Sequence, residues 1–524
     1  MATIPAQRGA DSQSFLDNRW LILFFSVISM IAVANFQYGW TLFVAPLQKH
    51  LNVELALIQV TFTVFVLLET WLVPFEGWLV DTFGPKLLVM IGGLLAGAGW
   101  YGSGKADTLT QLYISYAISG IGAGIVYGTA VGSALKWFPD HRGLAAGLTA
   151  AGFGAGSAAT VIPLDHMINP VGQAAGSGYQ HTFILWGIIQ GAVVVLAALF
   201  LKAPPPGWLP RTWRQKGSAE VKSRQSLRDF KPGEMAATPH FWLMYAMMTM
   251  VATGGVMATA QLAPMAKDFK VDKVTLHILA WTVTALPFAL LADRLLNGLC
   301  RPFWGWISDH IGREKTMTLA FGLEGVAKFA LLKFASNPML FVVFSAFTFF
   351  GWGEIFSLFP ALCGDFFGRK HATTNYGFLY TAKGTASVFV PIGSALVLGK
   401  AFDFRADILL LIGGALVFFT VFLAPTVFRM NLSGATKASL LGAAGTIVAY
   451  ALLLTVIPDK IWTPFPAKWT VPKIGWVGVF RITIVFDFAA ALLAFFVLRR
   501  MKAPAAIQEP VPGPEQQAAS AARA

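Results

Sequence analysis

The sequence predicts an all-α polytopic membrane protein, and three observations support that prediction. Apolar residues make up 56% of the 524 residues and charged residues only 12%, whereas soluble domains carry about 45–50% and about 25%. Apolar runs of about 20 residues, the length that a helix needs to cross a bilayer, recur along the chain. The two halves of the chain also repeat one another. This composition excludes a multidomain soluble protein.

The first half, residues 19–202, is predicted to form a bundle of six helices. A mostly polar segment at 1–18 precedes it and is expected to be a cytoplasmic tail. The apolar run that starts at Trp20 is too long for the apolar region of a signal peptide, so we expect no cleavable signal. The predicted spans lie near 20–45, 58–80, 86–105, 110–137, 143–164 and 181–202.

A polar, basic segment at 203–238 separates the halves and is predicted to be a cytoplasmic linker. Eight Lys or Arg residues lie between Lys202 and Lys231, and such residues concentrate in cytoplasmic loops. Thr238 is placed to cap the following helix, with Pro239 as its first residue. The net charge of +13 therefore belongs to loops and span ends and does not indicate nucleic-acid binding.

The second half is predicted to hold five spans within 239–400 and three more within 401–500, which makes about 14 spans in all. The first five lie near 239–263, 277–307, 316–335, 338–363 and 374–399, and the others near 406–428, 437–457 and 475–498. An even number of spans puts both termini on one side. Arg499 and Arg500, at the end of the last span, indicate that this side is cytoplasmic. The tail at 501–524, rich in Ala, Pro and Gln, is predicted to be disordered, and the protein is expected in the inner membrane.

The repeat is clearest in a Gly-x-x-x-Asp-x-x-Gly segment. Gly77 to Gly84 returns as Gly305 to Gly312, displaced by 228 positions. A small residue lets helices approach closely, and a carboxylate at a helix end can bind nearby N–H groups or a basic residue. We therefore expect a cytoplasmic gate formed by Gly77, Asp81, Gly305 and Asp309. A duplicated six-helix half joined by a cytoplasmic loop resembles the major facilitator transporters, whose fold is therefore expected.

Two cations inside spans point to a binding site. Arg301 and Lys383 lie about 12 Å and about 14 Å from the predicted cytoplasmic side, at about 1.5 Å per residue, which places both near the middle of a core about 30 Å thick. Ionisable residues at that depth are expensive and usually functional. We interpret the pair as a site for a small dianion, with no obvious local partner. The alternative is that Glu69 or Glu354 neutralises one cation or takes part in coupling.

Other residues at similar depth have two explanations. Four aromatic side chains could enclose a flat anion, although packing alone also explains aromatic residues in helices: Tyr38, Tyr127, Trp352 and Tyr380. Glu324 and Lys328 are spaced i, i+4 and are predicted to pair with each other. Structural partners are also expected for the remaining buried charges: Asp293, Arg294, Arg481 and Asp487.

Three segments carry a family resemblance: Gln37–Leu42, Asn297–Gly305 and Asn375–Lys383. They resemble the bacterial oxalate:formate antiporters over roughly residues 18–400. The resemblance implies that Arg301 and Lys383 hold the two carboxylates of oxalate. It also implies a surround formed by Gln37, Tyr38, Tyr127, Trp352 and Tyr380. Phe356 stands where family members can carry a tyrosine, and the two spans between about 400 and 475 exceed the usual twelve.

The predicted function is exchange of oxalate for formate or a related small carboxylate by alternating access. One alternative is proton-coupled monocarboxylate transport. Monocarboxylate transporters carry an aspartate where this chain has Asn297, although Glu69, Glu354 or Asp293 could replace it. A transporter-like sensor is a third alternative, disfavoured because the longest segment outside the spans is only 203–238.

No enzymatic motif, cofactor or metal site is predicted, since Cys300 and Cys363 lie in or beside apolar segments. The expected partners are a small carboxylate and the lipid bilayer, without nucleic acid, and the protein is expected to be a monomer.

Overall fold

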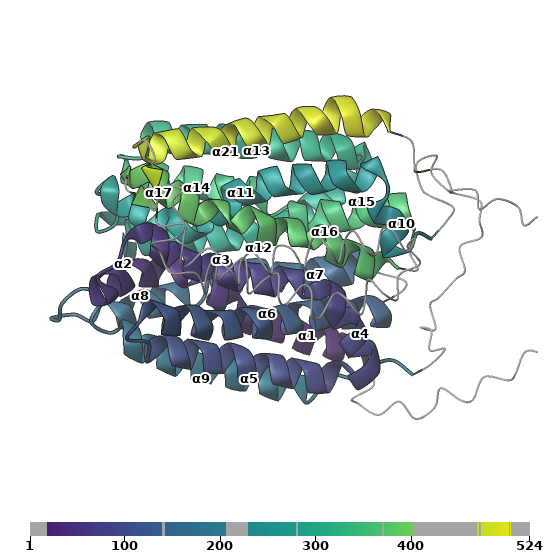
Figure 1. Cartoon of the computed structure of the whole chain (residues 1–524), viewed down its shortest axis with the longest axis horizontal. Helices are drawn as coiled ribbons and strands as arrows, with labels where there is room; N and C mark the ends of the chain where they lie inside the picture. The colour runs from purple at the N-terminus through teal and green to yellow at the C-terminus, as the bar shows by residue number, and fades with distance from the viewer. Residues whose placement is uncertain are drawn as a thin grey trace, which may run out of the picture.

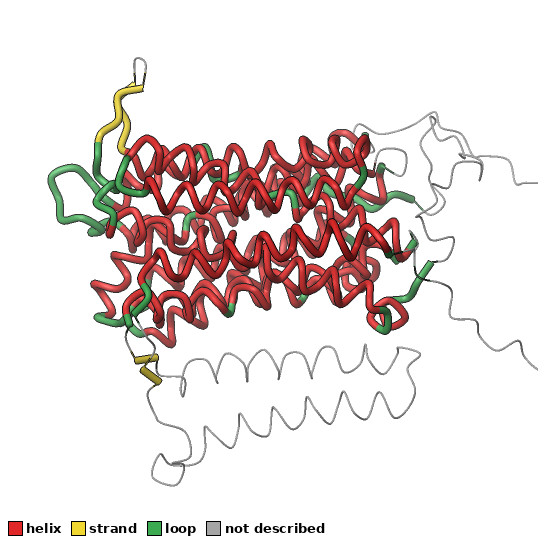
Figure 2. The backbone as a smooth tube through the Cα atoms, turned by 90° about the horizontal axis from the view of Figure 1, so that it is seen from above, coloured by secondary structure: helices red, strands yellow, loops and turns green. Residues whose placement is uncertain are grey.

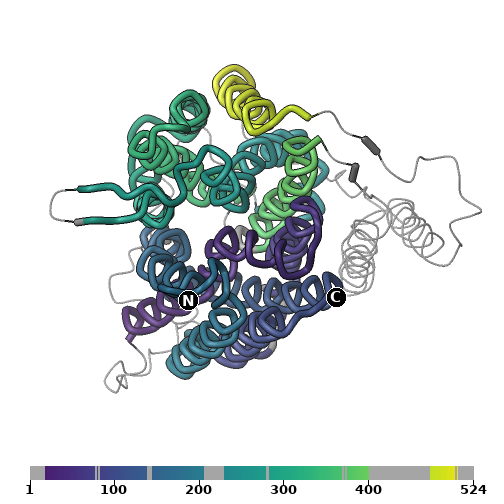
Figure 3. Tube along the Cα trace, turned by 90° about the vertical axis from the view of Figure 1, so that its left-hand side faces the viewer, coloured from purple at the N-terminus to yellow at the C-terminus, as the bar shows by residue number. Residues whose placement is uncertain are grey.

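The computed structural model describes residues 18–138, 142–205, 229–278, 281–368, 371–399, 401–402, 469–470, 473–501 and 504. Its helices run along one common axis in two bundles, one from each half of the chain (Figure 1). Figure 3 looks along that axis and shows the two bundles side by side. This is the duplicated architecture that the internal repeat predicted.

Each of the six spans predicted in the first half corresponds to a helix or a pair of helices. They are α1 (Arg19–Tyr38) with α2 (Trp40–Leu51), α3 (Leu55–Trp71) with α4 (Val73–Phe83), α5 (Pro85–Gly104), α6 (Leu109–Trp137), α7 (Arg142–Ala155) with α8 (Val161–Ile168), and α9 (Tyr179–Ala198). The ends of these helices are capped as the sequence allows. The Asn18 side chain accepts from the Trp20 backbone, and Thr108 forms a capping box with Gln111.

The second bundle begins after the linker. Its helices are α10 (Pro232–Ala236), α11 (Pro239–Asp268), α12 (Ala285–Ile311), α13 (Arg313–Phe334), α14 (Pro338–Trp352) with α15 (Ile355–Phe367), α16 (Ala372–Ser387) with α17 (Phe389–Leu398), and α21 (Gly475–Leu492). The last of these continues as a π-helical turn (Leu493–Val497) and then a 3₁₀ turn (Leu498–Arg500). The predicted cap is confirmed, because Thr238 Oγ1 accepts from the Phe241 backbone. The predicted spans at 406–428 and 437–457 lie outside the described residues.

Within the described ranges, nine helices or helix pairs are long and apolar enough to cross a membrane. Several spans predicted as continuous are broken near their middle, at Gly39, Leu72, 156–160, Gly353–Glu354 and Val388. Two of these breaks directly adjoin predicted site residues, Tyr38 and Trp352. Broken helices near the bilayer middle free backbone groups and side chains for a ligand, as in other transporters.

The predicted span at 277–307 is wrong at its start. Residues 275–284 form a two-stranded hairpin, in which β1 (Thr275–Ile278) pairs antiparallel with β2 (Trp281–Thr284). Threonine, valine and isoleucine dominate these strands and favour extended backbone. Figure 2 shows the hairpin protruding from one end of the bundles. We call this the hairpin end, and the opposite end, where α4 and α10 lie, the linker end.

The two halves contact each other on both sides of the middle. Towards the hairpin end, the Gln59 amide donates to the Ala260 carbonyl at 3.0 Å, and Thr41 Oγ1 accepts from the Ala263 backbone at 3.0 Å. Just to the linker side of the middle, two residues before Lys383 on α16, Trp71 Nε1 donates to the Thr381 carbonyl at 3.1 Å. These hydrogen bonds join the two halves.

A buried ion triad fastens α21 to α13. Lys328 Nζ lies 2.6 Å from a Glu324 oxygen, which confirms their predicted pairing, and 2.8 Å from an Asp487 oxygen. Asp487 therefore has the structural partner that was expected, whereas Arg481 is exposed. A second connection joins the flanks of the segment between α17 and α21, since β3 (Ala401–Phe402) pairs antiparallel with β4 (Trp469–Thr470).

Candidate substrate site

The two predicted cations come together on the second bundle, where it faces the first. Arg301 on α12 and Lys383 on α16 are both buried, with 1% and 0% of their surface exposed. Arg301 Cζ lies 4.5 Å and Lys383 Nζ 5.6 Å from the centroid of the same ring, that of Phe356. The cations therefore meet around one aromatic side chain, although 82 positions separate them in the sequence.

Lys383 is neutralised by the first half of the chain. Its Nζ donates to both Glu69 oxygens, at 3.0 and 2.9 Å, and to Gln37 Oε1 at 2.8 Å. Tyr380, one turn away on the same helix, adds a contact of 3.2 Å. The structure therefore agrees with the alternative that Glu69 neutralises one of the two cations, and that cation is Lys383. Its partner comes from α3, in the other bundle, and a buried charge needs such compensation.

Arg301 has only neutral partners. Its Nη1 donates to the Ala150 carbonyl and its Nη2 approaches Asn297 Oδ1 at 3.5 Å, while Nε has no hydrogen-bond partner. A Cβ at Gly154 would lie 3.0 Å from both Cζ and Nε of this guanidinium. A small residue is thus required there for the arginine to approach α7. The net positive charge of the pair remains on Arg301.

The predicted aromatic residues surround these cations. Tyr127 and Tyr380 stack with ring centroids 5.1 Å apart, and Phe356 contacts Trp352 at 5.3 Å. Trp352 Nε1 has no hydrogen-bond partner. Tyr38 accepts a hydrogen bond from the Asn297 amide at 3.1 Å. The structure therefore brings Tyr38, Tyr127, Trp352 and Tyr380 to the same region as Arg301 and Lys383.

Phe153 is a site residue that sequence reasoning missed. Its ring lies 5.6 Å from Lys383 Nζ, 5.3 Å from the Tyr127 ring and 5.4 Å from the Tyr38 ring. A signal was available, because Phe153 stands between two glycines. An isolated aromatic residue in a small-residue segment at that depth points to a specific contact.

Glu354 is not the partner of either cation. It is fully buried at the break between α14 and α15, and neither of its carboxylate oxygens has a hydrogen-bond partner. Of the two acids considered as charge partners, Glu69 alone binds a site cation in the described residues. A role for Glu354 in coupling stays a prediction.

The predicted gate residues lie apart from this site, at the linker end. Asp309, 63% exposed, pairs with Arg313 at 2.7 Å, and Arg313 also lies 3.4 Å from Asp365. These contacts connect α12, α13 and α15 within the second half. Gly305 lies one turn before Asp309 on α12. Gly77 and Asp81 belong to α4, and their contacts lie outside the described residues, so the gating role remains a prediction.

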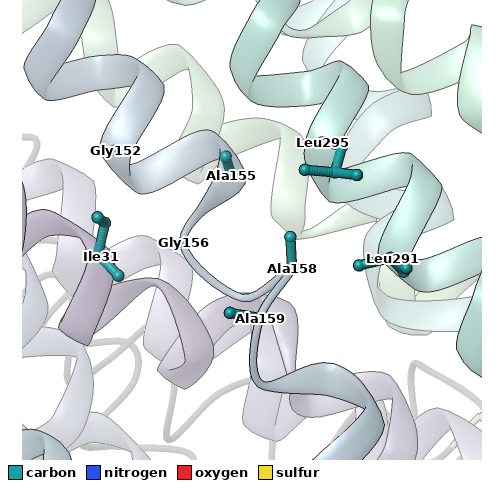
Figure 4. Close-up of a pocket in the computed structure, with 8 residues that line it drawn as sticks. All are labelled: Ile31, Gly152, Ala155, Gly156, Ala158, Ala159, Leu291 and Leu295. Atoms are coloured by element: carbon teal, nitrogen blue, oxygen red, sulfur yellow. The ribbon is translucent and has the colours of Figure 1, made fainter.

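A cavity of about 370 Å³ opens between α1, α7 and α12 (Figure 4). Its walls are formed by Ile31, Gly152, Ala155, Gly156, Ala158, Ala159, Leu291 and Leu295. All of these side chains are apolar or absent, so the cavity offers no group that would bind a carboxylate. The cations and aromatic residues described above are therefore the better candidate site.

Comparison with known proteins identifies the family. A model of the Major Facilitator Superfamily matches residues 22–297 and 245–438. The chain belongs to this superfamily. It is 37% identical over 380 residues to the oxalate:formate antiporter of Oxalobacter formigenes, covering 72% of the chain and 84% of that protein. The superfamily member described here is thus an integral membrane transporter that resembles oxalate:formate antiporters, and it is not an enzyme.

More distant relatives share the fold or parts of it. Apicoplast pyruvate carrier 1 of Toxoplasma gondii is 25% identical over 362 residues, covering 60% of this chain and 65% of that protein. A bacterial homologue of the human lysosomal transporter Spinster, solved in an inward-facing, unoccupied conformation, superposes with a TM-score of 0.56 at 14% identity. That superposition covers 94% of this chain and all of the other. It supports the major facilitator fold independently of close sequence similarity.

Proposed function

We propose that this transporter exchanges oxalate for formate across the inner membrane by alternating access. The observation that carries the proposal is the convergence of buried Arg301 and Lys383 on the Phe356 ring. Oxalate is a flat dianion whose two carboxylates can each accept charge-assisted hydrogen bonds from one cation, and such bonds are the strongest of their kind. Aromatic side chains around the cations suit its flat faces. The similarity to an oxalate:formate antiporter supports the same substrates.

Glu69 explains how one site suits both exchange partners. With Glu69 ionised and bound to Lys383, the three charged groups leave one net positive charge, which a monoanion such as formate neutralises. When Glu69 takes up a proton or turns away, two positive charges remain, which match a dianion. A buried site favours the ligand that cancels its charge. Binding of oxalate is therefore expected to displace or protonate Glu69.

The same ion pair supports a second candidate function, proton-coupled transport of a monocarboxylate. Asn297 occupies the position at which monocarboxylate transporters carry an aspartate. Glu69 could replace that aspartate, because a proton on Glu69 would remove its ion pair with Lys383. The two functions differ in what the empty carrier does. An exchanger returns only when loaded, whereas a proton-coupled carrier returns without carboxylate.

Exchange in liposomes distinguishes them. We expect purified protein to take up labelled oxalate rapidly into vesicles loaded with oxalate or formate, and about 100-fold more slowly into vesicles without carboxylate, a barrier difference of about 2.7 kcal/mol. Equal uptake into both, increased by an acidic exterior, would replace exchange with proton coupling. Absence of oxalate and formate transport under every condition would refute the substrate assignment.

We infer that the linker end faces the cytoplasm. The described basic residues Lys202 and Lys231, which flank the rest of the linker, lie at that end with Arg499 and Arg500, and basic residues are retained on the cytoplasmic side. Substrate arriving from outside would then enter at the hairpin end. The protein is proposed to act as a monomer, since each chain supplies both halves of the site.

A further inference from the structure

A second buried arginine, Arg294, shares a helix face with the site. Arg294 precedes Arg301 by seven residues on α12, which is two helical turns, so both side chains leave the same face about 10 Å apart along the axis. Arg294 lies on the hairpin side of Arg301 and is 1% exposed. The expected structural partner, Asp293, interacts with Arg294 electrostatically but forms no hydrogen bond with its terminal nitrogens.

The guanidinium of Arg294 is held by two rings and by no hydrogen bond at its tip. Its Cζ lies 4.4 Å from the centroid of Tyr38 on α1 and 4.5 Å from that of Phe349 on α14. Nη1 and Nη2 are buried without a hydrogen-bond partner. Both oxygens of the neighbouring Asp293 also lack a partner, so the two adjacent charges are not joined by a hydrogen bond.

This arrangement is unusual for an arginine that only supports the fold. A structural arginine directs its fork of N–H groups at carbonyls or carboxylates, because buried unpaired donors are costly. Aromatic faces attract the cation but leave the N–H groups unused. The terminal nitrogens of Arg294 are therefore available to bind a ligand.

Contacts connect Arg294 to the substrate site. The Tyr38 ring that contacts Arg294 carries a hydroxyl, which accepts a hydrogen bond from the Asn297 amide at 3.1 Å. The amide oxygen of Asn297 in turn lies 3.5 Å from Arg301 Nη2. Tyr38 belongs to the first half and Arg294 to the second. Separation of the halves at the hairpin end would therefore take the Tyr38 ring away from Arg294 and leave one face of the guanidinium uncovered.

We propose that Arg294 forms a second carboxylate-binding site, which receives a small carboxylate entering from the hairpin end and passes it to Arg301. The proposal rests on the proposed function for the nature of the ligand and on the orientation inferred above. One arginine can bind one carboxylate in bidentate fashion. The substrate thus meets one cation outside the middle of the bundle and two at the middle.

The test measures sidedness of labelled-oxalate exchange in cells and in membrane vesicles. Intact cells present the hairpin end to external oxalate, and inside-out vesicles present the linker end. We expect Arg294→Gln to raise the KM about tenfold in cells, the usual loss for a charge-assisted hydrogen bond, and to leave the KM in inside-out vesicles within about twofold of wild type. Arg294→Lys, which keeps the charge without the fork, should give an intermediate KM in cells. The matched control is Arg481→Gln on the exposed surface of α21.

The other possible results contradict either the second carboxylate site or the proposed function. An unchanged KM on both sides, or an equal increase on both sides, would show that Arg294 is structural and would overturn the second site alone. If Arg294→Gln does not fold, Arg294→Lys decides, because a KM equal to that of wild type in cells overturns the second site. If wild type exchanges neither oxalate nor formate, the proposed function falls and this proposal falls with it.

Discussion

At the scale of single residues, Arg301 and Lys383 differ in how their charges are compensated. Lys383 already binds the Glu69 carboxylate, the Gln37 amide oxygen and the Tyr380 hydroxyl. Arg301 has only a backbone carbonyl and the more distant amide oxygen of Asn297. A carboxylate ligand can therefore bind Arg301 without competition, but it reaches Lys383 only in competition with Glu69. The two cations are not equivalent, and their removal should have different effects.

Arg301→Gln is expected to abolish exchange of both substrates, because it removes the uncompensated charge. Lys383→Gln is expected to lower oxalate exchange by about 100-fold, in keeping with about 3 kcal/mol for a hydrogen bond between charged groups, while retaining part of formate exchange. Proteoliposome exchange measures both. Lys333→Gln, on the exposed end of α13, is the control. Near-wild-type oxalate exchange by Lys383→Gln would contradict the two-cation site.

Glu69→Gln imitates the protonated acid and frees Lys383. We expect it to raise the ratio of oxalate to formate exchange by about tenfold, or about 1.4 kcal/mol of differential binding. Wild-type oxalate exchange should increase as the pH falls, because protonation of Glu69 leaves both cations for the dianion, whereas the variant should lose this dependence. Exchange rates over a pH series, with the exposed Glu54→Gln as control, provide the measurement. Loss of both substrates would assign Glu69 a structural role.

The site could be predicted in part. Charges within apolar runs identify Arg301 and Lys383, because lipid tolerates a charge only for a reason. The sequence could not show that Lys383 binds Glu69, since 314 positions separate them and the contact depends on how the two bundles pack. For the same reason it did not distinguish Glu69 from Glu354, which lies unpaired at a helix break. The roles of Phe153 and Arg294 likewise depend on neighbours from other helices.

At the scale of secondary-structure elements, hydropathy locates spans well and their interruptions poorly. The span at 338–363 was correctly placed, but its break at Gly353–Glu354 carries no proline at that point. The sequence predicts a span from 277, where strands β1 and β2 form, because these residues are apolar as well as β-branched. Packing between elements adds a further constraint that composition cannot show, namely where a helix must lack a side chain.

Gly255 illustrates that constraint between α11 and α14. A Cβ at this position would overlap the Trp352 ring, so Gly255→Ala must displace the ring or the helix. We expect at least a tenfold loss of oxalate exchange, although alanine alone favours helix by about 1 kcal/mol. Gly322→Ala, where a Cβ meets nothing within 4 Å, is the matched control in the exchange assay. Equal activity of the two variants would show that Trp352 does not position substrate.

At the scale of the whole molecule, transport requires the halves to separate at one end and then at the other. In this structure hydrogen bonds join the halves towards the hairpin end and beside the candidate site, whose two cations are buried. Under the proposed mechanism, substrate that neutralises these cations stabilises the state in which they are buried more than the open states, which is the differential affinity that a conformational change needs. We therefore expect exchange to depend on contacts at the two ends as well as on the site.

Asp309→Ala tests the linker end. Its ion pair with Arg313 is 63% exposed on the aspartate side, and exposed pairs contribute about 0–1 kcal/mol, so we expect a change in maximal rate of up to about fivefold with KM unchanged. Asp107→Ala provides the control, because Asp107 is a similarly exposed acid at the hairpin end, 3.6 Å from His50. A large increase in KM with an unchanged maximal rate would place Asp309 at the substrate.

Removal of residues 403–468 tests whether the bundle is complete without them. Phe402 and Trp469 are direct partners in the β3–β4 pair, so a two-residue Asn-Gly turn can join them. We expect the shortened chain to insert and to exchange oxalate at close to the wild-type rate, because the Lys328–Asp487 contact still docks α21. Proteoliposome exchange and thermal unfolding measure this. A folded but inactive product would make the segment part of the transport mechanism.

The β3–β4 pair also bears on how such a chain can arise. A segment whose two ends lie side by side in the fold, as those of 403–468 do, can be gained or lost in one genetic event without moving the helices that carry the candidate site. If it crosses the membrane an even number of times, as the sequence predicts, the final helix keeps its direction and the terminus its compartment. Selection can then change the inserted segment and the transport site independently, which makes this junction a natural place for lineages of one transporter to diverge.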